Sequence, residues 1–140
     1  MIAVIIRTAL RQYAIRRGDV ASMIPIHTPA EVVALGSAQY PAISVELGAW
    51  FDAADRSPAG RRHALIVPLR RRPIVFLVER IEQALENPHV HPVPSLLANG
   101  LREEWALGVI TLEDQLAVLV DLRAVARSVV LHQRQDTQVC

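Results

Sequence analysis

Two histidines have the spacing in this sequence that best suits metal chemistry. His89 and His91 are one residue apart, so on a strand both imidazoles would lie on the same face. The neighbouring Asn87, Pro88 and segment 92–94 instead favour an extended surface connector with solvated histidines. No cysteine or suitably spaced carboxylate nearby completes the four ligands of a structural zinc site. We therefore expect no metal and no cofactor.

Nucleophilic and phosphate chemistry also lack a motif. The chain has six serines, and none lies in the G-x-S-x-G context of a nucleophile elbow. The adjacent carboxylates Glu103 and Glu104 favour a solvated turn, because neighbouring side chains rarely face one substrate. The six glycines are scattered singly, so no glycine-rich phosphate loop is present. The sequence predicts a protein that is not an enzyme.

Two clusters of arginine could indicate that the protein binds nucleic acid. Residues 61–62 and 70–72 are all arginine and could form one basic patch on a small barrel. Binding of single strands also requires aromatic stacking platforms, and most of the six aromatic residues lie in apolar contexts typical of a core. A charged hairpin tip that protects an edge strand is the favoured interpretation. Binding that falls steeply with salt would instead identify a nucleic-acid partner.

Length and composition narrow the class further. A chain of 140 residues with 51% apolar residues and a net charge of +1 forms one compact domain and has no global field that would select nucleic acid or membrane. The apolar run 1–6 is closed by Arg7 and is too short to span a membrane, so no membrane insertion is expected. Cys140 is the single cysteine, which fits a reducing, cytoplasmic setting.

Short β-branched runs closed by proline, glycine or charge predict strands. These runs are 2–6, 11–15, 24–28, 42–47, 64–69, 73–78, 107–112 and 116–122. Tight turns are expected to join the first two runs, the pair flanking the 70–72 arginines and the last two. Helical patterns are few, at 30–35, 96–104 and 121–131. This composition of elements predicts small barrels or a sandwich.

The chain also resembles itself at two places. Residues 45–49 are similar to 120–124, and each set ends an apolar run and enters a helical pattern. Upstream, 13–20 resembles 75–81. Two related halves of about 60 residues would form two similar small barrels that bury part of each other.

The order of these motifs resembles that of the CheW-like coupling domain of bacterial chemotaxis. In the second half the matching segments are Phe76–Ile81, Val93–Pro94, Leu107–Ile110 and Gln115–Leu122. In the first half they are Tyr13–Ile15, Val20, Thr28–Pro29, Leu35–Gly36 and Val45–Leu47. The resemblance spans roughly residues 3–130.

This resemblance implies a mainly β fold of two SH3-like five-stranded barrel subdomains packed together, with short helical segments. Within one domain, we expect 1–63 to form the first barrel, 64–131 the second barrel and 132–140 a frayed tail. Members of the family have no active site. They act as adaptors that couple a methyl-accepting chemoreceptor to a CheA-like sensor histidine kinase, which are the expected partners.

The resemblance also implies partner-binding residues in three groups. The first half supplies Val20, Ser22, Met23 and Ile24 on one surface; a turn supplies Gly36, Ser37 and Gln39; and Val109 and Ile110 would line a groove between barrels. Two positions depart from the family, because Ser22 replaces a usual glutamate and segment 36–40 lacks the arginine of an Arg-Gly turn. The alternative is therefore a divergent module with a structural or self-association role, forming a homodimer through an exposed edge strand.

Overall fold

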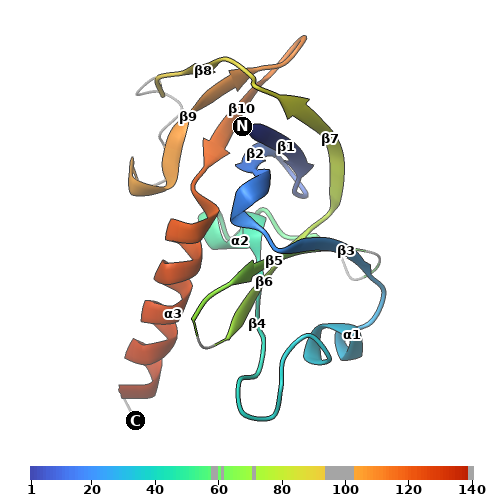
Figure 1. Cartoon of the computed structure of the whole chain (residues 1–140), viewed down its shortest axis with the longest axis vertical. Coiled ribbons are helices and arrows are strands. Elements are labelled where there is room, and N and C mark those ends of the chain that lie inside the picture. The colour runs from blue at the N-terminus through green and yellow to red at the C-terminus, as the bar shows by residue number, and fades with distance from the viewer. Residues whose placement is uncertain (58–59, 61, 71, 94–102, 139–140) are drawn as a thin grey trace.

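The expected strands form two sheets in a computed structural model that describes residues 1–57, 60, 62–70, 72–93 and 103–138 (Figure 1). Within these residues, sheet A has the order β7 (Arg80–Glu86), β1 (Ile2–Arg7), β2 (Gln12–Arg16), β10 (Leu116–Val120), β9 (Ala106–Thr111) and β8 (Val90–His91). Sheet B has the order β3 (Ser22–Ile26), β5 (Arg62–Pro68), β6 (Pro73–Val78) and β4 (Ile43–Glu46). The helices are α1 (Pro29–Val33), α2 (Leu47–Phe51) and α3 (Leu122–Gln138), with 3-10 turns η1 (Arg17–Asp19) and η2 (Glu103–Trp105).

The central strands are buried on both faces, which explains why their sequences are continuously apolar rather than alternating. In β1, Val4 and Ile6 join the large core between the sheets, whereas Ala3 and Ile5 line the smaller core inside sheet A. Strands β5 and β6 divide their side chains in the same way between the large core and a third cluster beneath α1. Helix α3 adds one apolar face to the large core, and sheet A forms the upper half of Figure 1 and sheet B the lower half.

The three expected hairpins are confirmed. Strand β1 pairs antiparallel with β2, β5 with β6 and β9 with β10. Thr8 closes the first turn, because its N–H donates to the Arg11 carbonyl at 2.9 Å. Short turns between apolar strands bring these partners together early and at low entropic cost.

The internal resemblance corresponds to an equivalence between four strands of each sheet. The order β7-β1-β2-β10 repeats as β3-β5-β6-β4, with two antiparallel pairings followed by one parallel pairing in both sets. The similar segments 45–49 and 120–124 are the parallel strand and the helix that follows it. Glu46 and Asp121 occupy matching positions, and each forms an ion pair with an arginine, Arg62 and Arg16 respectively. The residues that follow them, Leu47 and Leu122, are both fully buried.

The sheets do not follow the expected division of the chain at residue 63. After hairpin β1–β2 the chain crosses to sheet B and supplies β3 and β4; after hairpin β5–β6 it crosses back and supplies β7 and β10. Each sheet is therefore a hairpin of one half completed by strands of the other half. Among the described residues the strands also divide as six and four rather than five and five, because β8 and β9 extend sheet A beyond the four strands that repeat in sheet B.

The helices and one strand also differ from expectation. Helix α3 continues to Gln138, so the segment expected as a frayed tail from 132 is helical over most of its length. His132 packs edge-on against Trp50, with ring centroids 5.8 Å apart, which holds this part of α3 against α2. Strand β7 was not expected, because its polar residues hide the strand pattern. The expected helix at 96–104 lies mostly outside the described residues, which include only η2.

Within the described part of the chain, no helix is both long and apolar enough to cross a bilayer.

Candidate functional site

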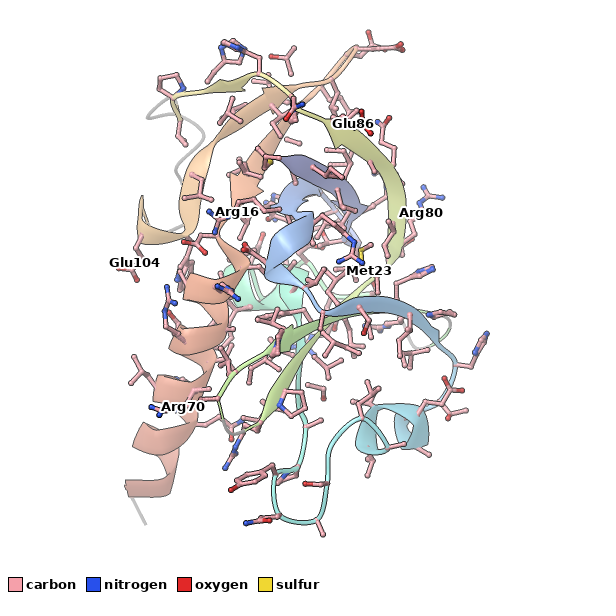
Figure 2. All side chains as sticks on the ribbon, viewed as in Figure 1. Arg16, Met23, Arg70, Arg80, Glu86 and Glu104 are labelled. Carbon is pink, nitrogen blue, oxygen red and sulfur yellow. The ribbon has the colours of Figure 1, made fainter. Side chains whose placement is uncertain are left out.

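The first group of expected site residues lies on and just before β3, an edge strand of sheet B. Val20 is buried in the large core and caps η1, where its N–H donates to the Arg17 carbonyl at 3.3 Å. Met23 packs partly against the same core and lies between the sheets in Figure 2. Ile24 packs against the cluster beneath α1, and Ser22 is half-buried opposite Ile66. Of this group, Ser22 offers a polar side chain at the surface, whereas Val20 belongs to the core.

The second group forms the turn between α1 and β4. The N–H of Ser37 donates to the Tyr40 carbonyl at 3.0 Å, and the Tyr40 N–H donates to Ser37 Oγ at 2.9 Å. Gln39 is exposed, and its Nε2 lies 3.4 Å from the Tyr40 hydroxyl. Gly36 has a steric role, because a Cβ there would lie 2.2 Å from the Ala42 nitrogen. The turn without arginine is thus a closed, self-bonded loop that presents Gln39 and Tyr40 to solvent.

The third group is buried rather than groove-lining. Val109 and Ile110 of β9 are each 2% exposed, and Ile110 belongs to the core inside sheet A. They are paired with His91 and Val90 of β8. Strand β8 lies where the sequence favoured an extended connector, and it pairs with β9 beside these two residues. A partner cannot reach these side chains while sheet A is intact, so the expected groove role does not fit their position.

Exposed apolar residues next to the second group were missed by the sequence reasoning. Val33 at the end of α1 is 75% exposed and Tyr40 in the following turn is 41% exposed. We call these two residues, together with Ser37 and Gln39, the α1 surface; they belong to α1 and the turn that follows it, in the lower half of Figure 1. Val33 is the last residue of this five-residue helix, and its neighbour Val32 packs against the cluster beneath α1, so the residue types alone did not show which valine is exposed.

A hollow of about 580 Å³ lies at one end of sheet A. Its lining comes from β1, β2, β7 and the β9–β10 turn and includes Arg7, Gln12, Gln83, Leu85 and residues 111–115. Arg7 Nε donates to Glu82 Oε1 at 2.6 Å, and this hydrogen bond lowers the pKa of Glu82. Arg7, the cationic side chain of the lining, is thus paired with Glu82, and the lining also contains the carboxylates of Glu113 and Asp114.

The buried carboxylate of Asp55 is held by structural partners. Asp55 is 1% exposed and accepts hydrogen bonds from Thr8 Oγ1 at 2.6 Å and from the Leu10 N–H at 2.8 Å. It thereby attaches the β1–β2 turn to the segment after α2. Next to it, burial raises the pKa of Tyr13 to about 12, against a weaker opposing effect of the Arg11 charge.

Two further clusters are the histidines at 89 and 91 and the arginines at 61–62 and 70–72. The His89 and His91 rings lie together with centroids 4.4 Å apart, but no three histidine, cysteine or acidic side chains of the described residues form a metal-binding group. Arg62 is committed to Glu46 and to the Ser57 carbonyl. Arg61 and Arg71 lie outside the described residues.

Comparison with known proteins identifies the fold. No protein-family model and no curated protein matches the chain. Among solved structures, the chain is similar to the crystal structure of the scaffolding protein TtCheW from Thermoanaerobacter tengcongensis, with a TM-score of 0.61 and 15% sequence identity. The alignment covers 86% of this chain and 84% of that chain. The fold is CheW-like. The expectation of a mainly β, CheW-like fold is therefore confirmed. At 15% sequence identity, this similarity establishes the fold and not the function.

Proposed function

We propose that this CheW-like chain is a non-enzymatic adaptor in chemotaxis-type signal transduction that couples chemoreceptors to a sensor histidine kinase through protein–protein contacts. The observation that carries the proposal is the similarity over 86% of the chain to a structure described as a scaffolding protein. A cytoplasmic location follows from such partners.

The α1 surface is the part of the molecule best suited to this role. Val33 and Tyr40 are apolar groups exposed beside polar Ser37 and Gln39, the mixture that protein interfaces use for an apolar centre and a polar rim. Ser22 and Ile24 on β3 extend this surface, because Ile24 packs against the same cluster as α1. Aromatic anchors such as Tyr40 contribute disproportionately to binding.

A binding experiment with charge substitutions at exposed apolar positions tests the proposal. The purified protein is immobilised and exposed to the kinase and the receptor cytoplasmic tips from its own genome, at about 0.15 M salt so that surface charge is screened. We expect Val33→Glu to weaken binding at least about tenfold, because it places a charge in the apolar centre of the contact. Leu116→Glu is the matched control, since Leu116 is 49% exposed but lies on sheet A.

Ser22→Glu restores the residue that the CheW family usually has at this position, and we expect it to strengthen binding to one of the two partners. The adaptor proposal is abandoned if the folded native protein binds neither kinase nor receptor. If Leu116→Glu lowers binding as much as Val33→Glu, the α1 surface is not the docking site.

A further inference from the structure

Strand β4 of sheet B lacks a neighbour that its counterpart in sheet A has. In sheet A, β10 pairs with β2 on one side and with β9 on the other. In sheet B, the equivalent strand β4 pairs with β6 and is the last strand among the described residues. The free side of β4 is therefore the position that β9 occupies in the repeated arrangement.

Strand registers match the two sheets residue by residue. Val120 of β10 lies opposite Ile15 of β2. Val45 of β4 lies opposite Phe76 of β6 in the same parallel sense. All four side chains belong to or pack against the large core, and neither parallel pairing contains a register shift. The residues before and after these two valines therefore correspond as well.

The hydrogen bonds of β10 determine which of its backbone groups face β9. The Asp121 N–H donates to the Trp105 carbonyl at 2.7 Å. At the other end, the Gln115 carbonyl accepts from the Leu112 N–H at 2.7 Å. The register shift in this pairing comes from one extra residue in β9, so β10 itself alternates without interruption. Leu119, two residues before Asp121, therefore also faces β9.

Ser44 and Glu46 occupy the positions of Leu119 and Asp121 in β4. The N–H and C=O of Ser44 and the N–H of Glu46 therefore face the free side, and no backbone hydrogen bond joins them there to another described element. The Ser44 side chain is exposed, whereas Leu119 is 3% exposed and shares an apolar cluster with Ile110 of β9. Unpaired backbone at a sheet edge is a template for a further strand.

The inner faces of the two sheets also correspond, except at β9. Matched side chains line or pack against the apolar cluster of each sheet, as the pairs Ala3 and Ala64, Ile5 and Ile66, Ala14 and Val75, and Leu85 and Ile24. Strand β9 adds Ile110 to the cluster of sheet A. In the described part of sheet B, α1 supplies Val32 to the cluster but leaves the Ser44 side chain exposed. A strand added beside β4 therefore gains apolar contact on its inner face as well as backbone hydrogen bonds.

Strand β9 is the template for what fits beside β4. It runs antiparallel to β10 for six residues and presents Gly108 opposite Leu119. Because Ser44 is smaller than Leu119, a larger apolar residue fits opposite Ser44. A second copy of β4 is less suited to this position, because β4 has only four residues and enters α2 directly.

We propose that the free side of β4 binds an extended, apolar segment of a partner protein, which adds to sheet B as an antiparallel strand. The Ser44 N–H and C=O and the Glu46 N–H hold this segment, in the mode of β-strand addition. The site is the backbone edge of β4 and not the side chains of the α1 surface. It does not depend on the adaptor function proposed above.

Hydrogen exchange in the free protein tests whether this side of β4 is open. We expect the Ser44 and Glu46 amides to exchange at least about a hundredfold faster than those of Leu119 and Asp121, their counterparts beside β9. Val45, whose N–H faces β6, is the internal control and is expected to exchange slowly. Slow exchange at Ser44 overturns the proposal, because that amide would already be bonded within the chain or to a second copy.

A peptide based on β9 tests binding. The probe is a fluorescein-labelled peptide with the sequence of residues 105–112 and the substitution Gly108→Val. The valine prevents replacement of β9 itself, because in sheet A a Cβ at this position would lie 2.7 Å from the His91 carbonyl oxygen. We expect fluorescence anisotropy to give a Kd between about 10 µM and about 1 mM. The same peptide with Gly108→Pro is the control and is expected to bind at least about tenfold more weakly, because it lacks the N–H that faces Ser44.

Two substitutions at Ser44 separate the backbone from the side chain. Ser44→Pro removes the outward N–H and is expected to weaken peptide binding at least about tenfold, whereas Ser44→Ala keeps the N–H and is expected to bind as the native protein does. Thermal unfolding checks that both variants are folded. Whether or not Ser44→Pro folds, the peptide is expected to slow exchange at Ser44 and Glu46 of the native protein and to leave Val45 unchanged.

Absence of peptide binding up to about 1 mM overturns the proposal, as does equal binding of the valine and proline peptides. Unchanged exchange at Ser44 with the peptide bound places the contact elsewhere and overturns it too. If only the adaptor proposal fails, kinase and receptor binding is lost while these peptide results stand.

Discussion

Buried polar side chains determine how the turns of this small domain are held. Asp55 is the clearest case, because its carboxylate accepts hydrogen bonds from Thr8 and from the Leu10 N–H, with the Arg11 guanidinium 3.7 Å away. Gly48 packs directly against it, and an added Cβ there would lie 2.8 Å from the Asp55 carboxyl carbon. The carboxylate therefore has no room to find alternative partners.

We expect Asp55→Asn to lower the free energy of unfolding by about 1–3 kcal/mol, because the new amide group leaves a buried donor facing other donors. Urea denaturation measures the change. Asp52→Asn is the matched control on the same segment; Asp52 is exposed and bonds Arg11 at 2.8 Å, so a smaller effect is expected. Equal losses for the two variants would contradict this role for Asp55.

Tyr13 makes stability depend on alkaline pH. Burial raises its pKa from 10.0 to about 12, so the folded state favours the neutral phenol. The stability that comes from this group is complete below about pH 10 and is lost as pH rises towards 12, by up to about 2–3 kcal/mol. Urea denaturation between pH 8 and about 12 should show this fall, and Tyr13→Phe should reduce it while keeping the contact with the Phe51 ring. An unchanged pH dependence in Tyr13→Phe would assign the fall to other groups.

The turn between α1 and β4 depends on a close contact between two backbone segments and not only on the pattern of apolar residues. The turn between α1 and β4 passes so near Gly36 that a Cβ would lie 2.2 Å from the Ala42 nitrogen and 2.8 Å from the Pro41 carbonyl carbon. This approach lets the chain reverse between a five-residue helix and a four-residue strand. The same turn carries Tyr40 of the α1 surface.

We expect Gly36→Ala to cost about 1–3 kcal/mol of stability, because the contacted atoms are backbone and cannot move aside cheaply. Gly18→Ala is the control, since a Cβ at Gly18 meets nothing within 4 Å. Thermal unfolding followed by circular dichroism compares the two. A neutral Gly36→Ala would mean that the turn readily adopts another path.

The whole molecule is held together by exchange of strands between its two sheets. Because each hairpin is completed by strands from the other half of the chain, neither sheet can form from a contiguous segment. The large core is also shared, with Ile6 and Ile15 from sheet A packed in the same cluster as Leu65 and Phe76 from sheet B. We therefore expect both sheets to unfold in one cooperative transition.

Phe76→Ala tests this cooperativity. Phe76 is fully buried in the shared core, so its truncation should cost about 3–5 kcal/mol. Hydrogen exchange should show the same loss of protection for the slowest amides of β1 and β5, although Phe76 lies in sheet B. The exposed Leu116→Ala is expected to change neither. Loss of protection confined to sheet B would instead mean that the sheets unfold separately.

The sequence by itself determined the local structure and the general fold. Apolar runs closed by charge or proline specified most strands, short polar turns specified the three hairpins, and the order of motifs indicated a CheW-like fold that the structural comparison confirms. Tertiary structure decided which runs join which sheet. Hydrophobic burial has no direction, so an apolar run must be buried but does not state against which neighbour.

The same reason explains the site residues. Val20, Val109 and Ile110 are apolar strand-end or strand residues, and only packing shows that they are core rather than surface. The reverse holds for Val33, which α1 leaves exposed, and for β7, whose polar pattern acquires meaning from its position at the free edge of sheet A. The sequence states the type of each side chain. Its exposure to solvent depends on which strands and helices pack over it in the folded chain.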